Sequence, residues 1–320
     1  MANKTKKLGL AVNQEQSIQA DKSKVVHKPV LMQEVLHYLH PQPNKVYVDV
    51  TLGGGGHTRA ILEKEPTCKV IGMDWDKSVI QTTGVRLQAD FPDRFIPAWG
   101  NFAKIYAILG KMGYQKVDGI LADFGTSQIQ IANTAGLSIY QDKFLDMRMS
   151  TAFFQTTAQD IVKNASEKEL ATIFFEYGQE RYGHKIARAI VQARAKEQIR
   201  TTKQLAEIIE SVVPWNKDSK IHPATRVFQA LRIVVNKELE NIQSFLSNSM
   251  QLLKPEGRLV CISFHSLEDR IVKQFFKELE KNPLIQVEIL TQKVCTATQE
   301  ELEANRSARS AKLRAIKFIK

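Results

Sequence analysis

The feature that most constrains the fold is a glycine-rich loop after an apolar, β-branched segment near the N-terminus. Residues 46–48 read Val-Tyr-Val, Asp49 follows, and four consecutive glycines occupy residues 53–56 before a helical pattern over 58–62. Glycines let a backbone approach a ligand closely at the beginning of a helix, where N–H groups lack partners. A second apolar segment, residues 68–74, ends in Asp74, which is placed to hold a ribose. This unit predicts a site for a cofactor that contains adenosine.

The spacing of the glycines distinguishes two classes of cofactor. A dinucleotide fingerprint needs a third glycine where this chain has Thr58 or Arg59, and no Gly-Lys-Ser/Thr follows to form a nucleotide P-loop. Asp49 suits the ammonium group of S-adenosylmethionine, whereas it would repel a pyrophosphate. The loop therefore favours S-adenosylmethionine, and an NAD-linked reductase is the alternative from another class.

Apolar segments alternate with helical patterns, which predicts a mostly parallel α/β sheet. The five strand-like segments are residues 45–51, 68–74, 94–99, 117–123 and 258–264. Residues 135–221 instead carry helical patterns, with capping boxes that begin at Ser166 and Thr201. Residues 285–290 and 313–319 are expected to form an antiparallel pair at the sheet edge. The chain is thus predicted to be a sheet domain interrupted by an all-helical insert.

The charge of the chain favours an anionic partner, with nucleic acid first among the candidates. The net charge is +11 and the pI is about 9.4, and residues 1–26 form a polar tail with five lysines, expected to be disordered. The three cysteines are too scattered for a disulfide framework or a zinc site, and Cys68 and Cys261 are expected to be buried. No apolar run reaches membrane-spanning length and no secretory signal is evident, so a cytoplasmic protein is expected, or a mitochondrial matrix protein if eukaryotic.

Acids end three of the predicted strands. Because the carboxyl ends of parallel strands form the ligand crevice, Asp49, Asp74 and Asp123 are expected to line one rim. Phe102 follows the third strand and could stack on an adenine or pack in the core. The seven scattered histidines form no ligand cluster, so no metal is expected.

Several basic and polar residues are candidates for binding the substrate. In residues 222–240, Arg226, Gln229, Arg232 and Asn236 recur at helical spacing and could face the crevice. Ser266 is expected to cap the helix after the fifth strand, which places His265 on the rim. Two groups of basic residues are suited to phosphate. The insert carries Arg181, Lys185 and Arg188, and the C-terminus carries Arg306, Arg309, Lys312 and Arg314.

Long motifs in this chain resemble the RsmH (MraW) family of S-adenosylmethionine-dependent methyltransferases, which modify the N4 amine of a cytidine in small-subunit ribosomal RNA. The matching motifs lie at residues 27–31, 49–57, 145–149 (LDMRM), 222–232 (HPATRVFQALR) and 262–273 (ISFHSLEDRIVK). The resemblance implies a class I methyltransferase (Rossmann-like) domain over residues 27–134 and 222–320, with an inserted helical RNA-recognition domain at 135–221. It also implies a cofactor site formed by Gly55, Gly56, His57, Asp74, Phe102, Asp123 and Gln130.

The implied partner is small-subunit ribosomal RNA or the assembling small subunit, and a homodimer is left open. The substrate contacts are expected at Arg226, Arg232, His265 and Arg309. Asp123 is the best-placed catalytic residue, because a carboxylate near a delocalised exocyclic amine favours a more pyramidal nitrogen. The chain departs from the family pattern at Gln128, Ala132, Lys143 and Ser150. The alternative is therefore a catalytically weakened homologue that binds RNA as a ribosome assembly factor.

Overall fold

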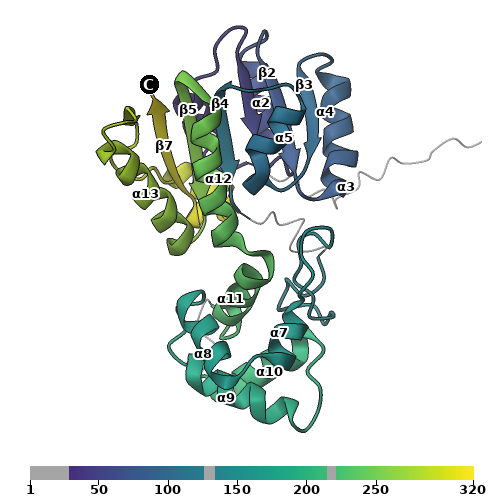
Figure 1. Cartoon of the computed structure of the whole chain (residues 1–320). Coiled ribbons are helices and arrows are strands. Elements are labelled where there is room, and N and C mark those ends of the chain that lie inside the picture. The colour runs from purple at the N-terminus through teal and green to yellow at the C-terminus, as the bar shows by residue number, and fades with distance from the viewer. Residues whose placement is uncertain (1–28, 126–133, 215–220) are drawn as a thin grey trace, which may run out of the picture.

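The computed structural model describes residues 29–125, 134–214 and 221–320. A sheet flanked by helices forms one unit, and a group of helices forms a second unit beside one end of it (Figure 1). No helix in the described part of the chain combines the length and hydropathy needed to cross a membrane.

Seven strands form a single sheet in the order β3-β2-β1-β4-β5-β7-β6. The first five strands run parallel, whereas β7 lies antiparallel between β5 and β6. This strand order is that of the class I methyltransferase fold, so the predicted fold class is confirmed. The strands are β1 (Val46–Asp49), β2 (Lys69–Asp74), β3 (Phe95–Trp99), β4 (Val117–Asp123), β5 (Leu253–Ser263), β6 (Val287–Ile289) and β7 (Lys312–Phe318).

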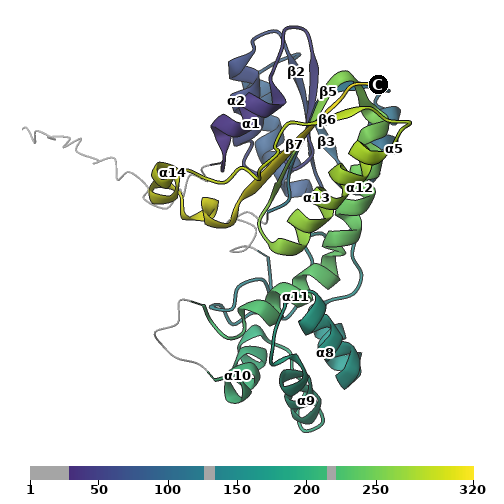
Figure 2. The same cartoon turned by 90° about the vertical axis from the view of Figure 1, so that its left-hand side faces the viewer.

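Helices cover both faces of the sheet (Figure 2), and an apolar core lies between the sheet and the helices on each face. One face is covered by α1 (Met32–Leu39), α2 (Gly56–Lys64) and α4 (Val85–Asp90), and the other by α5 (Ile105–Lys111), α12 (Glu238–Leu252) and α13 (Ser266–Lys281). The remaining elements are short: α3 (Lys77–Val79), a π-helical turn (Ile80–Gly84), α14 (Gln299–Ala304) and 3-10 turns at Phe102–Lys104 and Arg306–Ser310.

The helical unit has an apolar core of its own. Its helices are α7 (Ala158–Asn164), α8 (Glu167–Glu176), α9 (Gly183–Arg194), α10 (Thr202–Val212) and α11 (Thr225–Asn236). The capping boxes predicted at Ser166 and Thr201 both form, and Thr157 makes a third with Asp160. Buried side chains of α11 complete this core, so the helical unit extends beyond residue 221.

Lys237 separates the helical unit from the sheet unit. Polar residues recur at helical spacing from Arg226 to Asn236, and the helix ends at Asn236 because Lys237 has a left-handed backbone (φ 48°). After this break α12 begins at Glu238 and packs against the sheet, whereas α11 remains with the helical unit (Figure 1).

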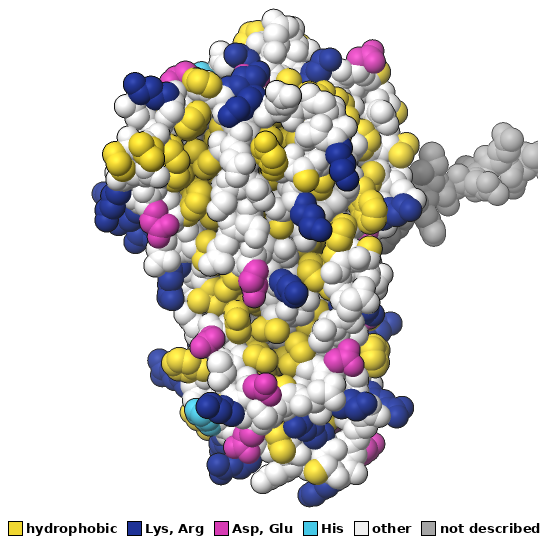
Figure 3. Space-filling view, viewed as in Figure 1, with side chains coloured by type: hydrophobic (Ala, Val, Ile, Leu, Met, Phe, Trp, Pro, Cys, Tyr) yellow, Lys and Arg dark blue, Asp and Glu magenta, His cyan; other side chains and the backbone are white. Residues whose placement is uncertain are grey.

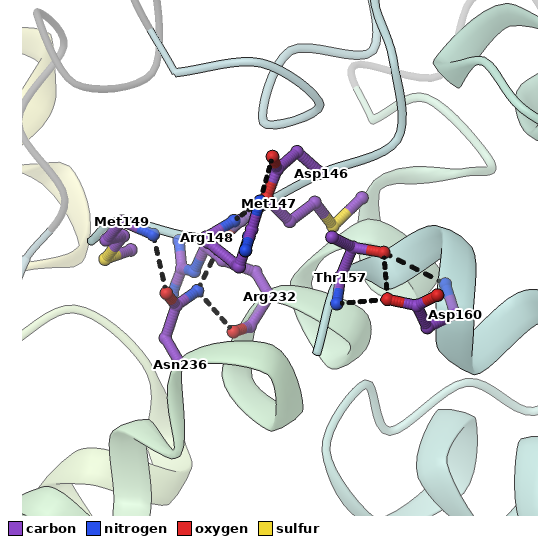
Figure 4. A network of polar contacts seen from close by, with 8 residues as sticks. All are labelled: Asp146, Met147, Arg148, Met149, Thr157, Asp160, Arg232 and Asn236. Atoms are coloured by element: carbon purple, nitrogen blue, oxygen red, sulfur yellow. Dashed lines mark hydrogen bonds and ion pairs between the residues drawn. The ribbon is translucent and has the colours of Figure 1, made fainter. Parts of the chain in front are cut away.

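Asn236 joins the end of α11 to the Leu-Asp-Met-Arg-Met motif (Figure 4). Its Oδ1 accepts the Met149 N–H at 2.7 Å, and its amide donates to the carbonyls of Met147 and Arg232, both at 2.8 Å. Asn236 is fully buried, which corrects the expectation that it faces the crevice. The motif therefore has a structural task, because it fixes the loop beside the site.

Candidate active site

A cavity of about 390 Å³ lies at the carboxyl ends of β1, β2, β4 and β5, with α11 and the C-terminal 3-10 turn beside it. Six of the seven expected cofactor residues line it: Gly55, Gly56, His57, Asp74, Phe102 and Asp123. The seventh, Gln130, lies outside the described residues. Arg232 and His265 line the same cavity from the side expected to receive the substrate.

The glycine loop is held by its conformation and its packing. Gly53 and Gly55 have positive φ angles of 47° and 78°, which side-chain-bearing residues rarely adopt. A Cβ on Gly55 would lie 2.7 Å from Thr83 Cγ2 and 2.8 Å from Leu87 Cδ1, atoms on the protein side of the loop. Gly55 is therefore required for the fold as well as for the cavity wall.

Asp49 lies beneath the loop and is not among the residues that line the cavity. Its Oδ2 accepts the Thr58 hydroxyl at 2.7 Å, and its Oδ1 accepts the Thr51 N–H at 3.1 Å. Burial raises the pKa of Asp49, although His57 and these hydrogen bonds oppose the shift. The structure thus gives Asp49 a role in holding the loop, in contrast to the rim position expected for it.

Asp74 braces the loop from the end of β2. Its Oδ2 accepts the Gly53 N–H at 3.0 Å and its Oδ1 accepts the Asp76 N–H at 2.9 Å. Burial raises the pKa of Asp74 to about 6, with the two N–H groups acting in the opposite direction. Its carboxylate remains on the cavity wall, where hydroxyl groups of a ligand could reach it.

Asp123 presents an oxygen without a partner to the site. Among the described residues, its Oδ1 is buried and accepts no hydrogen bond, while its Oδ2 lies 3.9 Å from His57 Nδ1. Burial raises the pKa of Asp123 to about 6, His57 opposes the shift, and neighbouring carboxylates add to it. The Asp123 N–H donates to the Thr51 hydroxyl at 2.7 Å, which locks β4 to the glycine loop.

Aromatic rings form one wall of the cavity. Trp75 and Phe102 lie with their ring centroids 5.5 Å apart, and Phe124 follows at 5.9 Å from Phe102. Phe154 does not line the cavity but meets Trp75 edge-on, with the two ring centroids 5.5 Å apart. Sequence reasoning identified Phe102 but not Trp75, although Trp75 directly follows the rim acid Asp74.

Two of the four expected substrate residues lie away from the cavity. Arg226 is exposed at the beginning of α11, where the backbone packs against Gly178 within the helical unit. Arg309 is exposed and does not line the cavity, whereas Arg306, Ser307 and Ser310 of the same 3-10 turn do. Contrary to expectation, Arg226 therefore does not face this cavity, and contact of Arg226 and Arg309 with RNA stays a prediction.

The other two residues are fixed by buried carboxylates. Arg232 makes a two-pronged ion pair with Glu238, at 2.8 and 2.9 Å. His265, and not Ser266, caps α13: its Nδ1 accepts the Glu268 N–H at 3.4 Å, and Glu268 Oε2 accepts the N–H of His265 at 3.3 Å. Sequence reasoning missed Glu238 and Glu268, although each stands in the first turn of its helix.

Glu238, His265 and Glu268 place potential ligand atoms within 4.8 Å of one another. Protein partners already occupy most of the potential ligand atoms of this cluster, and His265 Nε2 is an exception. Glu238 uses both oxygens for Arg232, Glu268 Oε2 accepts two backbone N–H groups, and His265 Nδ1 is engaged in the helix cap. A divalent ion at this point would also lie close to the Arg232 guanidinium.

The basic residues of the helical unit are exposed. Lys and Arg gather around the end of the molecule where α9 and α10 lie (Figure 3). The side chains of Arg181, Lys185 and Arg188 are all exposed, and Arg188 Nε lies 3.4 Å from Glu167 Oε1. Their contact with RNA remains a prediction.

The cysteines lack the properties of a nucleophile. Cys68 and Cys261 are fully buried, as expected. Burial raises the pKa of Cys68 to about 11 and also raises the pKa of Cys261 and Cys295. No cysteine of the chain is among the residues that line the cavity.

Residues 24–319 match the MraW methylase family. The chain belongs to this family. It is 45% identical to a ribosomal RNA small subunit methyltransferase H from Carboxydothermus hydrogenoformans, over 90% of this chain and 96% of the relative. A protein of the same name from Syntrophotalea carbinolica is 47% identical, over 92% of this chain and 98% of the relative. The family resemblance inferred from the motifs is confirmed.

A solved structure of a putative methyltransferase from Streptococcus mutans, in complex with SAH, aligns over 90% of this chain and 97% of its own. It has a TM-score of 0.44 and 10% sequence identity. The assignment of the fold rests on the strand order described above.

Proposed function

We propose that this protein transfers a methyl group from S-adenosylmethionine to the N4 amine of a cytidine in small-subunit ribosomal RNA. The observation that carries the proposal is the buried, unpartnered Oδ1 of Asp123 in a cavity shared by the glycine loop and the helical unit. An exocyclic amine has hydrogens to donate, and a carboxylate oxygen is a matched acceptor. The family and the names of the relatives support methylation of ribosomal RNA.

The residues around the glycine loop fit S-adenosylmethionine. Trp75 and Phe102 offer an apolar wall for the adenine, and Asp74 offers a carboxylate for the ribose hydroxyls. Asp123 supplies the negative charge that a sulfonium or ammonium group needs in a buried site. When bound, this cofactor supplies a methyl group already activated by the positive charge on sulfur.

Asp123 then has two tasks toward the amine. Its Oδ1 accepts a hydrogen bond from N4, which orients the nitrogen and favours a more pyramidal geometry. Methyl transfer to N4 would break the carbon–sulfur bond of the sulfonium and leave a neutral thioether, while the proton that N4 gives up would pass to the Asp123 carboxylate. A pKa near 6 leaves Asp123 mostly ionised at neutral pH and still basic enough to accept that proton. The Nδ1 atom of His57 lies 3.9 Å from the other carboxylate oxygen of Asp123, Oδ2.

The helical unit is assigned to the RNA. Its exposed basic residues can contact phosphates, and the target base must leave its stack to reach Asp123. A ribosomal substrate also places the protein where ribosomes assemble, which is the cytoplasm in bacteria.

A transfer assay with labelled cofactor and small ribosomal subunits tests the proposal. The expected product after digestion is N4-methylcytidine, strongly reduced with Asp123→Ala. Replacement of the three cysteines by alanine or serine is expected to preserve transfer. Label confined to 5-methylcytidine, or activity that vanishes with the cysteines in a folded variant, would refute the assignment. A protein that binds cofactor and RNA but transfers no methyl group would support the assembly-factor alternative.

A further inference from the structure

Two buried side-chain atoms in the described part of the chain lack a hydrogen-bond partner, and both belong to residues that line the active-site cavity. One is Oδ1 of Asp123 and the other is Nε2 of His265. Unpartnered buried polar atoms are rare in native proteins because each is destabilising. Two of them in a single cavity indicate a ligand that satisfies both.

The helix cap determines which ring nitrogen of His265 carries the hydrogen. Nδ1 accepts a hydrogen bond from the Glu268 N–H, so Nδ1 must present its lone pair. In the neutral ring the hydrogen then resides on Nε2. Glu268 Oε1 lies 3.2 Å from Nε2 but makes no hydrogen bond with it. Nε2 is therefore a donor that faces the cavity without an acceptor.

The cavity thus combines a carboxylate acceptor with an imidazole donor. Cytosine presents the complementary pair on neighbouring atoms, because its N4 amine donates and its N3 accepts. We propose that His265 is the residue that reads the base, donating from Nε2 to cytosine N3 while Asp123 accepts from N4. This inference rests on the proposed function and adds a specificity-determining residue to it.

The same pair of residues rejects uracil. Uracil reverses the pattern, with an oxygen at position 4 and an N–H at position 3. Its oxygen would face the Asp123 carboxylate and its N–H would face the His265 N–H, which leaves all four groups unpaired in a buried site. Glu268 acts as a positioning residue, since its backbone N–H fixes the tautomer and its carboxylate accepts the His265 and Phe264 N–H groups.

The test compares two changes that remove the same hydrogen bond. On the RNA side, the target cytidine is replaced by 3-deazacytidine, which has C–H in place of N3 and retains the N4 amine. On the protein side, His265→Asn removes the Nε2 donor, and asparagine remains a favourable N-cap residue. Wild-type protein is expected to methylate the deaza substrate about tenfold more slowly than cytidine, the effect of one hydrogen bond to a buried partner.

The decisive quantity is the ratio of the two rates for each protein. His265→Asn is expected to be about tenfold slower on cytidine and to show no further loss on the deaza substrate, because the bond is already absent. Ser166→Asn, which exchanges the N-cap of α8 in the helical unit, is the matched control and should discriminate like the wild type. Undiminished discrimination by His265→Asn would overturn the proposal.

A second measurement requires no turnover. The ¹⁵N chemical shifts of the His265 ring in the free protein are expected to show a protonated Nε2 and an unprotonated Nδ1 at pH 8. Hydrogen on Nδ1 would overturn the proposal even if transfer occurs. Failure to form N4-methylcytidine at all would refute the proposed function instead, so the two failures are distinguishable.

Discussion

Removal of the Asp123 charge should stabilise the ligand-free protein. The pKa of Asp123 is about 6 in the folded protein and 3.8 in the reference state, so the folded protein binds this proton more tightly than the unfolded chain. The contribution of Asp123 to stability therefore declines as pH rises through the window from about 4 to 6. Asp123→Asn removes the cost of the buried charge. The free energy of unfolding of the variant should therefore exceed that of the wild type by about 0.6 kcal/mol at pH 4 and by about 3 kcal/mol at pH 8.

Urea unfolding at several pH values measures this gain as the difference between variant and wild type. Asp118 on the same strand provides a control of opposite sign. The pKa of Asp118 is lowered: burial acts to raise it, but hydrogen bonds from the Val46 N–H and from Lys254 outweigh that effect. Asp118→Asn should therefore destabilise the protein above pH 4. A gain for Asp123→Asn that is constant from pH 4 to 8 would refute the reasoning.

Three further predictions concern other parts of the molecule. Asn236→Ala should lower the free energy of unfolding by about 2–4 kcal/mol, because it removes three hydrogen bonds made by a fully buried side chain. Urea titration measures the loss, and a change below 1 kcal/mol would contradict the prediction. Gly55→Ala should lower the melting temperature even without cofactor, because its Cβ collides with two side chains; an unchanged value would show that the loop adjusts. Reversing the charges of the exposed residues Arg181, Lys185 and Arg188 should weaken RNA binding and flatten its salt dependence, while the affinity for the cofactor stays constant. Fluorescence titration measures the RNA affinity and calorimetric titration the cofactor affinity. Lost cofactor affinity in the folded variant would argue against separate tasks for the two units.

Much of the sheet unit could be predicted from local patterns. The apolar segments that precede Asp49, Asp74 and Asp123 are strands in the expected places, and the antiparallel β6–β7 pair forms as predicted. Such predictions succeed because parallel strands buried on both faces read as apolar runs. The capping boxes at Ser166 and Thr201 succeeded because their partners stand three residues away.

Features that depend on tertiary contacts were not predictable in this way. The chain turns at Lys237 because α11 and α12 pack in different units. Asn236 looks like an exposed polar residue until its partners, Met147 and Met149, are brought to it from far along the chain. Arg226 carried the right charge, but only the placement of its helix shows that it lies away from the cavity.

The central claim is that this protein forms N4-methylcytidine in small-subunit ribosomal RNA. Mass spectrometry of nucleosides from that RNA, prepared from cells with and without the protein, tests it most directly. N4-methylcytidine should be reduced when the protein is absent, and should return with the wild-type chain but not with Asp123→Ala. An unchanged level of N4-methylcytidine, together with loss of a different methylated nucleoside, would contradict the account.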